Sequence, residues 1–415
     1  MVKLNHHLLS AITTSLLLSN PAFAAEETTQ AAAATTTTAE KTTKETDKKA
    51  EKEVNKEAEK NTEEKAEEQP KAELPDPALL RQQYAVHPTQ WPAATTADNV
   101  APKPMAPLPH ANPTPEPAMV ALGERLFNDT ILSRDNTVSC ATCHEPRLMF
   151  GDMRRNAIGI DRQVGTRNTP NIFAIDQWES FFWDGRAKTA AEQAIMPIEN
   201  PIEMDLPIDQ AVARLNNDNS YRQQFAPLFN LSSKDAITKE MLGTALAEFE
   251  RTIRLPDTPY QTFITKAWNN DDTALNDLTD QQLQGLHLFR TKALCMTCHE
   301  GELLSDNEFH VTGLHFYNRR FQDLGRYEHT KNPEDSGKFR TPSLLAASQT
   351  GPWMHNGLFS NFIGIINFYN HAGVEARPKK GQEDDPLLPK KSPLLKPLGL
   401  NREELIVINE FLKTL

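Results

Sequence analysis

The stretch SCATCHEP at residues 139–146 carries two cysteines separated by two residues, with a histidine directly behind the second. LCMTCHEG at residues 294–301 repeats this pattern. The six residues that form the two motifs are Cys140, Cys143 and His144 in the first, and Cys295, Cys298 and His299 in the second. The 415-residue chain contains four cysteines in all, so the two motifs use every thiol.

Closely spaced cysteines occur in zinc sites, redox dithiols and covalent haem sites. A structural zinc site usually needs a second pair of ligands near the first, and a thioredoxin-like dithiol needs no histidine at the next position. The Cys-x-x-Cys-His spacing lets two thiols form thioethers with a porphyrin while the adjacent imidazole reaches the iron. The two motifs therefore predict two covalent c-type haems, with His144 and His299 as iron ligands.

The surroundings of the two motifs indicate a duplicated unit. GERLF at 123–127 precedes the first motif and GLHLF at 285–289 precedes the second, an offset of 162 residues (285 − 123). AEFERTI at 247–253 and NEFLKTL at 409–415 recur at the same offset, and both carry apolar residues at helical spacing. Shared amphipathic composition alone is the alternative. We expect an all-α protein with two class I cytochrome c-like domains, each with one haem.

The N-terminal part of the chain is not typical of a globular domain. Residues 1–24 combine a basic start, a short apolar run and small residues at 22 and 24, which predicts a cleaved signal peptide and a periplasmic protein. The alternative is that this segment stays uncleaved as a membrane anchor. We expect membrane association only in that case. Residues 25–105 are rich in Ala, Thr, Glu, Lys and then Pro, which predicts a disordered tether.

The folded part is expected to contain an N-terminal haem domain at 106–275 and a C-terminal haem domain at 276–415. The net charge of −12 and the lack of a basic patch argue against a nucleic-acid partner.

The first haem lacks an obvious second axial ligand, because no histidine lies between His144 and His287. The open alternatives are Met149, Met153, Met196, Met204, His87 and His110. None of them is clearly placed for the role, and we favour an open iron position, which a haem needs in order to bind a small substrate. The stretch SFFWDGRAKTAAEQAIMPIENPIEMD at 180–205 follows, and its notable residues are Trp183, Gln193, Pro197 and Glu203.

With these residues, the chain from about Pro107 to its end resembles the bacterial di-haem cytochrome c peroxidase and MauG family. The resemblance implies that Trp183 lies between the haems and that Gln193, Pro197 and Glu203 form the pocket on the open side of the first haem. It also implies a Ca²⁺ site, with Asn168 of RNTP as a side-chain ligand and the carbonyls of Thr350 and Pro352 as partners.

The expected role of Glu203 is general acid–base catalysis, since cleavage of peroxide requires moving a proton from one oxygen to the other. A surface glutamate is the plain alternative for Glu203, and a core aromatic is the plain alternative for Trp183.

The second haem separates two branches of this family. In the better-known peroxidase branch a methionine lies 14 residues after the histidine of the MHNG-type motif, and here that position is Tyr369. This resembles the MauG branch, in which a tyrosine ligates the second iron, and a phenolate should lower its reduction potential. Met354 and His371 remain alternative ligands, and Tyr369 could also be a core aromatic. The better-known branch also carries a blocking histidine sixteen residues after the first motif, where this chain has Ile160, so no reductive activation is expected.

The leading functional hypothesis is a peroxidase that reduces hydrogen peroxide at the first haem, with electrons entering through the second. The expected electron donor is a small cytochrome c, a cupredoxin or a membrane quinol. A MauG-like enzyme that oxidises side chains of a partner protein is the second hypothesis, favoured by Tyr369 and Ile160. A plain periplasmic electron carrier is the third, and the pocket of Gln193, Pro197 and Glu203 argues against it.

Overall fold

The computed structural model describes residues 73–255 and 257–415, and these are mainly helical. The predicted signal peptide and the tether up to residue 72 lie outside the described residues. The helices of the described part are α2 (Pro77–Tyr84), α3 (Pro117–Asn128), α4 (Cys140–Cys143), α5 (Ala190–Glu199), α6 (Ile208–Asn217), α7 (Asn219–Leu228), α8 (Lys239–Glu250), α9 (Pro259–Trp268), α10 (Asp280–Arg290), α11 (Tyr327–Thr330), α12 (Phe362–Asn370) and α13 (Arg402–Leu412). The strands β1 (Phe309–His310) and β2 (Phe339–Arg340) pair antiparallel. The expectation of a helical protein is thus confirmed.

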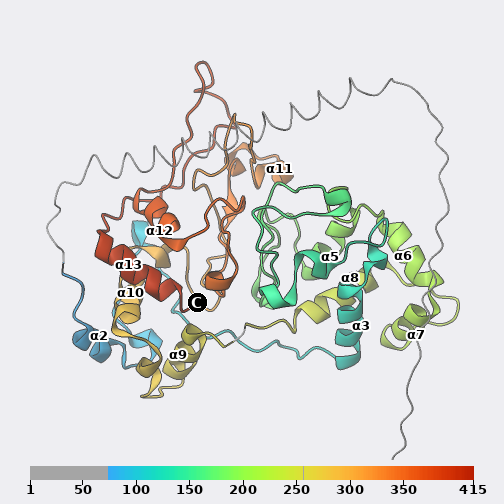
Figure 1. The fold of residues 1–415 in the computed structure, drawn as a ribbon, viewed down its shortest axis with the longest axis horizontal. Coiled ribbons are helices and arrows are strands. Elements are labelled where there is room, and N and C mark those ends of the chain that lie inside the picture. Colours follow the sequence, from blue (N-terminus) through green and yellow to red (C-terminus); the bar gives the residue numbers. More distant parts are fainter. Residues whose placement is uncertain (1–72, 256) are drawn as a thin grey trace, which may run out of the picture. The chain divides into compact units, whose positions relative to one another are not determined.

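The same close helix crossing occurs once in each half of the molecule (Figure 1). In the first half, a Cβ atom added at Gly123 of α3 would lie 2.0 Å from the carbonyl oxygen of Ala245 in α8. In the second half, a Cβ atom at Gly285 of α10 would lie 2.0 Å from the carbonyl oxygen of Val407 in α13. Only glycine permits this approach of two backbones. The repeated GERLF and GLHLF segments therefore occupy equivalent crossings.

Two hydrophobic cores organise the described residues. The first core joins α3, α5, α6, α7 and α8, and its largest fully buried side chains include Phe127, Tyr221 and Phe225. The second core joins α2, α9, α10, α12 and α13. Helix α9 belongs to this second core through Tyr260 and Phe263, which are both fully buried. The expected boundary between residues 275 and 276 would assign α9 to the first domain, whereas the buried side chains of α9 pack in the second core.

The expected tether also ends earlier than residue 105. Helix α2 begins at a Pro behind the N-cap Asp76 and buries Leu80 and Tyr84 against the second core. Further along, Trp91 stacks on Phe263 with ring centroids 5.7 Å apart. The prediction of disorder up to residue 105 was wrong because the apolar side chains after residue 73 supply enough buried surface to offset the cost of ordering this segment.

This N-terminal segment runs beside the second cysteine motif. The backbone N–H of Ala97 donates to the hydroxyl of Thr297, and that of Lys103 donates to the carboxylate of Glu300. The guanidinium of Arg290 in α10 donates to the hydroxyl of Tyr84, at 2.9 Å.

In the described residues, no helix combines the length and the apolar character that a bilayer crossing requires.

Candidate haem sites

The first motif occupies the short helix α4, whose N-terminus is closed by a capping box between Ser139 and Thr142. His144 follows as the C-cap, and its backbone N–H donates to the carbonyl of Cys140 at 2.9 Å. Its ring Nδ1 lies 3.0 Å from the carbonyl oxygen of Phe150, so Nδ1 carries the proton and Nε2 is left as the donor for a metal. Burial lowers the pKa of His144, which keeps this imidazole neutral.

The second motif repeats this geometry. The backbone N–H of His299 donates to the carbonyl of Cys295 at 2.8 Å, and its Nδ1 lies 2.9 Å from the carbonyl oxygen of Leu304. Burial lowers the pKa of His299 as well. Both histidines therefore present Nε2 in the same way, with the ring orientation fixed by a backbone acceptor.

No disulfide joins the four cysteines, which all lie in the described part of the chain. Burial raises the pKa of Cys140, Cys143 and Cys295 to about 12, so these side chains are neutral. Each pair lies beside a neutral imidazole, and each motif lines a cavity. This donor set fits a covalently attached haem, with the cysteines as attachment points and His144 and His299 as axial ligands.

The cavity of His144 brings together all four residues expected to act there. Trp183, Gln193, Pro197 and Glu203 all line it. Gln193 and Pro197 lie one turn apart on α5, whose N-terminus is capped by the hydroxyl of Thr189. Pro197 lies inside the helix and cannot donate to the carbonyl of Gln193, and α5 ends two residues later.

Glu203 is held at the edge of this cavity by its own loop. Its Oε1 accepts a hydrogen bond from the side-chain amide of Asn200 at 2.8 Å, and its carbonyl accepts from the N–H of Ile160 at 2.9 Å. Burial raises the pKa of Glu203 above its usual value, and the charge of Arg186 and the bond from Asn200 oppose part of that rise. A carboxyl group whose pKa is raised in this way accepts and returns a proton more readily than an exposed one.

The alternative ligands for the first haem lie elsewhere. The cavity of His144 is lined by no second histidine, no methionine and no tyrosine of the described residues. Met204 is buried in the first core, Met149 packs against that core, and Met153 is exposed. Neither Met196 nor His110 lines the cavity, and the ring of His87 packs at a tilt against Trp268 in the second half. An open iron position is the arrangement that this lining favours.

Two of the three alternative ligands for the second haem line the cavity of His299. Tyr369, near the end of α12, lines it together with Met354. His371 is exposed and does not line it. Burial raises the pKa of Tyr369, with the nearby Cys298 and Cys295 adding to the rise, so the free phenol is neutral. Tyr369 and Met354 thus both line the cavity that the imidazole of His299 lines.

Trp183 and Arg340 are the two described residues that line both cavities. The indole Nε1–H of Trp183 donates to the carbonyl of Asn168 at 3.0 Å. Its ring meets the ring of His355 edge to face, with centroids 6.3 Å apart, and His355 stacks on Phe339 at 3.5 Å. Burial lowers the pKa of His355 to about 3, so this ring is neutral.

Arg340, Phe339 and His355 were not identified as site residues from the sequence. Arg340 and Phe339 form strand β2, and nothing in the local pattern of FRTP predicts that the strand meets Trp183. His355 belongs to the MHNG motif, which was used only as a marker for Tyr369. Their proximity arises from contacts between residues more than 150 positions apart.

Ion pairs join the two halves next to Trp183. Arg167 makes two hydrogen bonds to Asp323, at 2.7 and 2.8 Å, and one to Asp184 at 2.6 Å. Burial alone would raise the pKa of Asp323, but the hydrogen bonds and charge of Arg167 hold it below its usual value. Because Asp184 directly follows Trp183, this network holds the tryptophan against the second half.

The three residues expected to bind calcium are only partly brought together. Asn168 and Thr350 line one cavity, which Trp183 and Tyr369 also line. Pro352 is not among the residues that line it. The side-chain amide of Asn168 donates to the carbonyl of Arg154 at 2.8 Å. Of the described residues, only Cys298, Asp306 and His310 form a cluster of metal-binding side chains, and Cys298 belongs to the second cysteine motif.

Comparison with known proteins places this geometry in context. Residues 117–269 match the family described as di-haem cytochrome c peroxidase. The methylamine utilization protein MauG of Methylorubrum extorquens is 35% identical over 314 residues, which cover 74% of this chain and 81% of that protein. A cytochrome-c peroxidase of Pseudomonas sp. (strain SCT) is 32% identical over 345 residues, which cover 75% of this chain and 85% of that protein.

Solved structures agree with these matches. A MauG-like protein associated with microbial copper homeostasis aligns with a TM-score of 0.61 and 28% identity, covering 77% of this chain and 95% of that one. The di-haem peroxidase BthA of Burkholderia thailandensis aligns with a TM-score of 0.59 over 78% of this chain and 94% of its own. At 22% identity, that second likeness shows the fold alone.

Proposed function

The chain belongs to the di-haem cytochrome c peroxidase and MauG family and is an oxidoreductase, and we propose that it reduces hydrogen peroxide to water at the cavity of His144. Electrons enter through the cavity of His299. The observation that carries this proposal is the asymmetry of the two cavities. Glu203 and Gln193 line the cavity that lacks a second strong ligand, whereas Tyr369 and Met354 line the other one.

Each half is proposed to be a class I cytochrome c-like domain with one covalent haem. Cys140, Cys143 and His144 hold the first haem, and Cys295, Cys298 and His299 hold the second. When bound, the haems supply iron that binds peroxide and stores and transfers single electrons. The remaining chemistry is assigned to side chains of this chain.

Glu203 moves the proton. Its carboxylate accepts the proton of the inner peroxide oxygen and delivers it to the outer oxygen, which leaves as water when the O–O bond breaks. The overall reaction consumes two electrons and two protons for each peroxide and yields two waters. Asn200 fixes the orientation of the carboxylate, and Gln193 and Pro197 shape the wall beside it.

Trp183 lies on the electron path between the two cavities. Its indole is held by the hydrogen bond to the carbonyl of Asn168 and by the edge-to-face contact with the ring of His355. Its orientation toward both cavities is therefore set before the reaction. A π-system in this position can pass electrons from the second site to the first.

The test is the Glu203→Gln variant of the holoprotein, with Glu192→Gln as the matched control. Glu192 is exposed in the first turn of α5, the helix that carries Gln193 and Pro197, and it does not line the cavity. Glu203→Gln should retain two haems and lose about two to four orders of magnitude in peroxide turnover, while the control stays near wild type. Unchanged turnover in Glu203→Gln would remove the residue from the mechanism.

A second candidate function is oxidation of side chains of a partner protein, as a MauG-like enzyme. The observation that favours it is the position of Tyr369 in the cavity of His299, where a phenolate ligand would stabilise oxidised iron. The two functions separate when peroxide turnover is measured with reduced donors and the mass of candidate partner proteins is followed in parallel. Rapid turnover with a donor supports the peroxidase, and oxidised partner protein without donor turnover supports the alternative.

The donor is proposed to be a small cytochrome c, a cupredoxin or a quinol, and the compartment is proposed to be the periplasm, on the strength of the N-terminal sequence. A Ca²⁺ ion near Asn168 and Thr350 is also proposed, since both line one cavity at the junction of the halves. Metal analysis of the purified holoprotein before and after chelation tests the calcium assignment.

A further inference from the structure

Three arginines line the cavity of His144, and they differ in their partners. Arg167 is paired with Asp184 and Asp323, and Arg186 contacts both carboxylate oxygens of Asp184, at 3.0 and 3.1 Å. Arg340 has no carboxylate partner among the described residues. It is the one cation of the three whose charge is uncompensated by the protein.

The guanidinium of Arg340 has protein partners for only part of its surface. It lies 3.6 Å over the ring of Trp178, and its Nε donates to the carbonyl of Phe182 at 3.3 Å. Its Nη1 is buried and has no hydrogen-bond partner. Burial lowers the pKa of Arg340 to about 9. A buried cation with unmet donors is costly unless an anion that is not part of the protein satisfies it.

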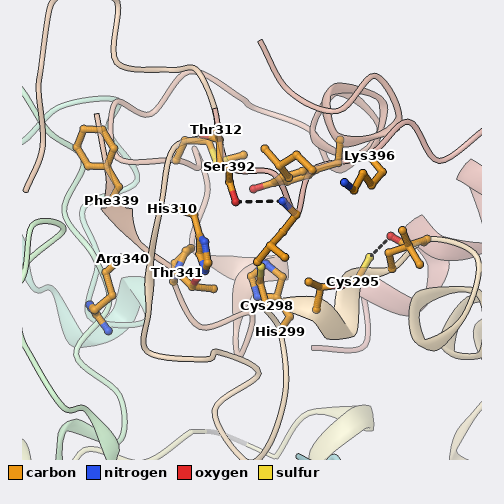
Figure 2. Close-up of a pocket in the computed structure, with 18 of the residues that line it drawn as sticks. Cys295, Cys298, His299, His310, Thr312, Phe339, Arg340, Thr341, Ser392 and Lys396 are labelled. Carbon is orange, nitrogen blue, oxygen red and sulfur yellow. Dashed lines mark hydrogen bonds between the residues drawn. The ribbon is translucent and has the colours of Figure 1, made fainter. Parts of the chain in front are cut away.

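The backbone of Arg340 explains how it reaches this position. It lies in β2 of the second half, and its N–H donates to the carbonyl of Trp183 at 2.8 Å. Figure 2 shows its side chain directed away from His299 and Cys298. The stacking on Trp178, which lines the cavity of His144, places the guanidinium at that cavity.

We propose that Arg340 binds a carboxylate of the haem held by His144, so that a residue of the second half anchors the cofactor of the first. A haem carries two carboxylates, and a guanidinium matches a carboxylate with two parallel N–H donors. This inference rests on the proposed haem at His144. It makes Arg340 a positioning residue, since its contact is with the edge of the cofactor and not with the reacting oxygens.

The contact has an electrostatic consequence. Reduction of the iron adds one negative charge to the haem, and a nearby cation stabilises the reduced form. Loss of the cation should therefore make the haem of His144 harder to reduce. Arg340 lines both cavities, but its guanidinium stacks on Trp178, which lines only the cavity of His144, so the effect should be smaller at the haem of His299.

The test is a spectroelectrochemical titration of the holoprotein in which the two haems are resolved. Arg340→Gln should lower the equilibrium constant for reduction of the first haem about tenfold, which is ~59 mV for one electron. Arg340→Lys keeps the charge and should retain most of the wild-type value. Arg81→Gln is the control, because Arg81 is already paired with Asp280 and lines neither cavity.

A wild-type potential in Arg340→Gln with full haem content would overturn the inference. A crystal structure of the wild-type holoprotein gives a second measurement that needs no variant, and it should place Nη1 of Arg340 within hydrogen-bond distance of a haem carboxylate oxygen. A guanidinium far from both carboxylates would equally overturn the inference and leave the proposed peroxidase intact. Fewer than two haems in the wild-type protein would instead overturn the proposed function, and this inference with it.

Discussion

Gly159→Ala should disable the enzyme without replacing any residue that we propose to act on the substrate. Gly159 packs directly against the loop that carries Glu203. A Cβ atom at position 159 would lie 2.1 Å from the carbonyl oxygen of Ile202 and 2.7 Å from the Cα of Glu203. Because real Cβ atoms stay at least 3.0 Å from such neighbours, the Glu203 loop must move by about 1 Å.

A displacement of this size is costly for proton transfer, since a misplacement of about 1 Å in a catalytic group costs on the order of 100-fold in rate. Peroxide turnover in Gly159→Ala should therefore fall about 100-fold, with both haems still attached. The assay is steady-state peroxide reduction with a reduced donor, set beside the haem content and the absorption spectrum of the second haem, which should not change.

Gly165→Ala provides the matched control. Gly165 lines the same cavity, but its added Cβ atom would meet nothing nearer than 3.5 Å, at the carbonyl oxygen of Ala157. This variant should stay within about twofold of wild type, since 3.5 Å is ordinary van der Waals contact. Equal turnover in the two variants would refute the reasoning that the position of Glu203 limits the rate.

Three further predictions concern other parts of the molecule. Tyr369→Phe should shift the low-spin absorption of the second haem without loss of haem; if only Met354→Ala does so, Met354 is the ligand. Burial raises the pKa of Glu250 to about 8, so the native state keeps a proton that the unfolded state loses as pH rises above its ordinary pKa. In urea unfolding, the free energy of unfolding of Glu250→Gln should therefore rise relative to that of wild type between about pH 4.5 and pH 8, by at most about 5 kcal/mol. An unchanged difference between the two proteins over this pH range would contradict the prediction. Trp91→Ala should destabilise the second core by about 3 kcal/mol in thermal or urea unfolding, and an unchanged midpoint would show that this segment is not part of the core.

The sequence was sufficient for features that depend on short spacings. Each cysteine motif places its histidine beside the thiols within one turn, so the chemistry of Cys140 and His144 could be predicted before their surroundings were known. The repeated helix pair was also predictable, because the apolar spacing of α8 and α13 is local. Gln193 and Pro197 came from a resemblance, and the structure places both in the cavity of His144.

The features missed from the sequence depend on contacts across the chain. In the sequence, Arg340 cannot be told from any other arginine. Only the structure shows that it is buried beside Trp178 with no carboxylate partner among the described residues. The segment after residue 73 was assigned to the tether because its prolines and charges outweighed its few apolar residues. Tyr84 and Trp91 are informative only once their partners Arg290 and Phe263 are known.

The contacts between the two halves converge on Trp183, the residue that we propose passes electrons between them. The carbonyl of Trp183 accepts a hydrogen bond from Arg340 at 2.8 Å, and the neighbouring Asp184 is held by Arg167, which also binds Asp323 of the second half. The backbone N–H of Asn168, whose carbonyl orients the indole, donates to the backbone carbonyl of His355 at 2.7 Å. A charge-assisted, partly buried network is poorly suited to maximising stability, because desolvation offsets much of its gain. It is well suited to fixing one geometry, and electron passage past Trp183 requires a fixed geometry with respect to both cavities.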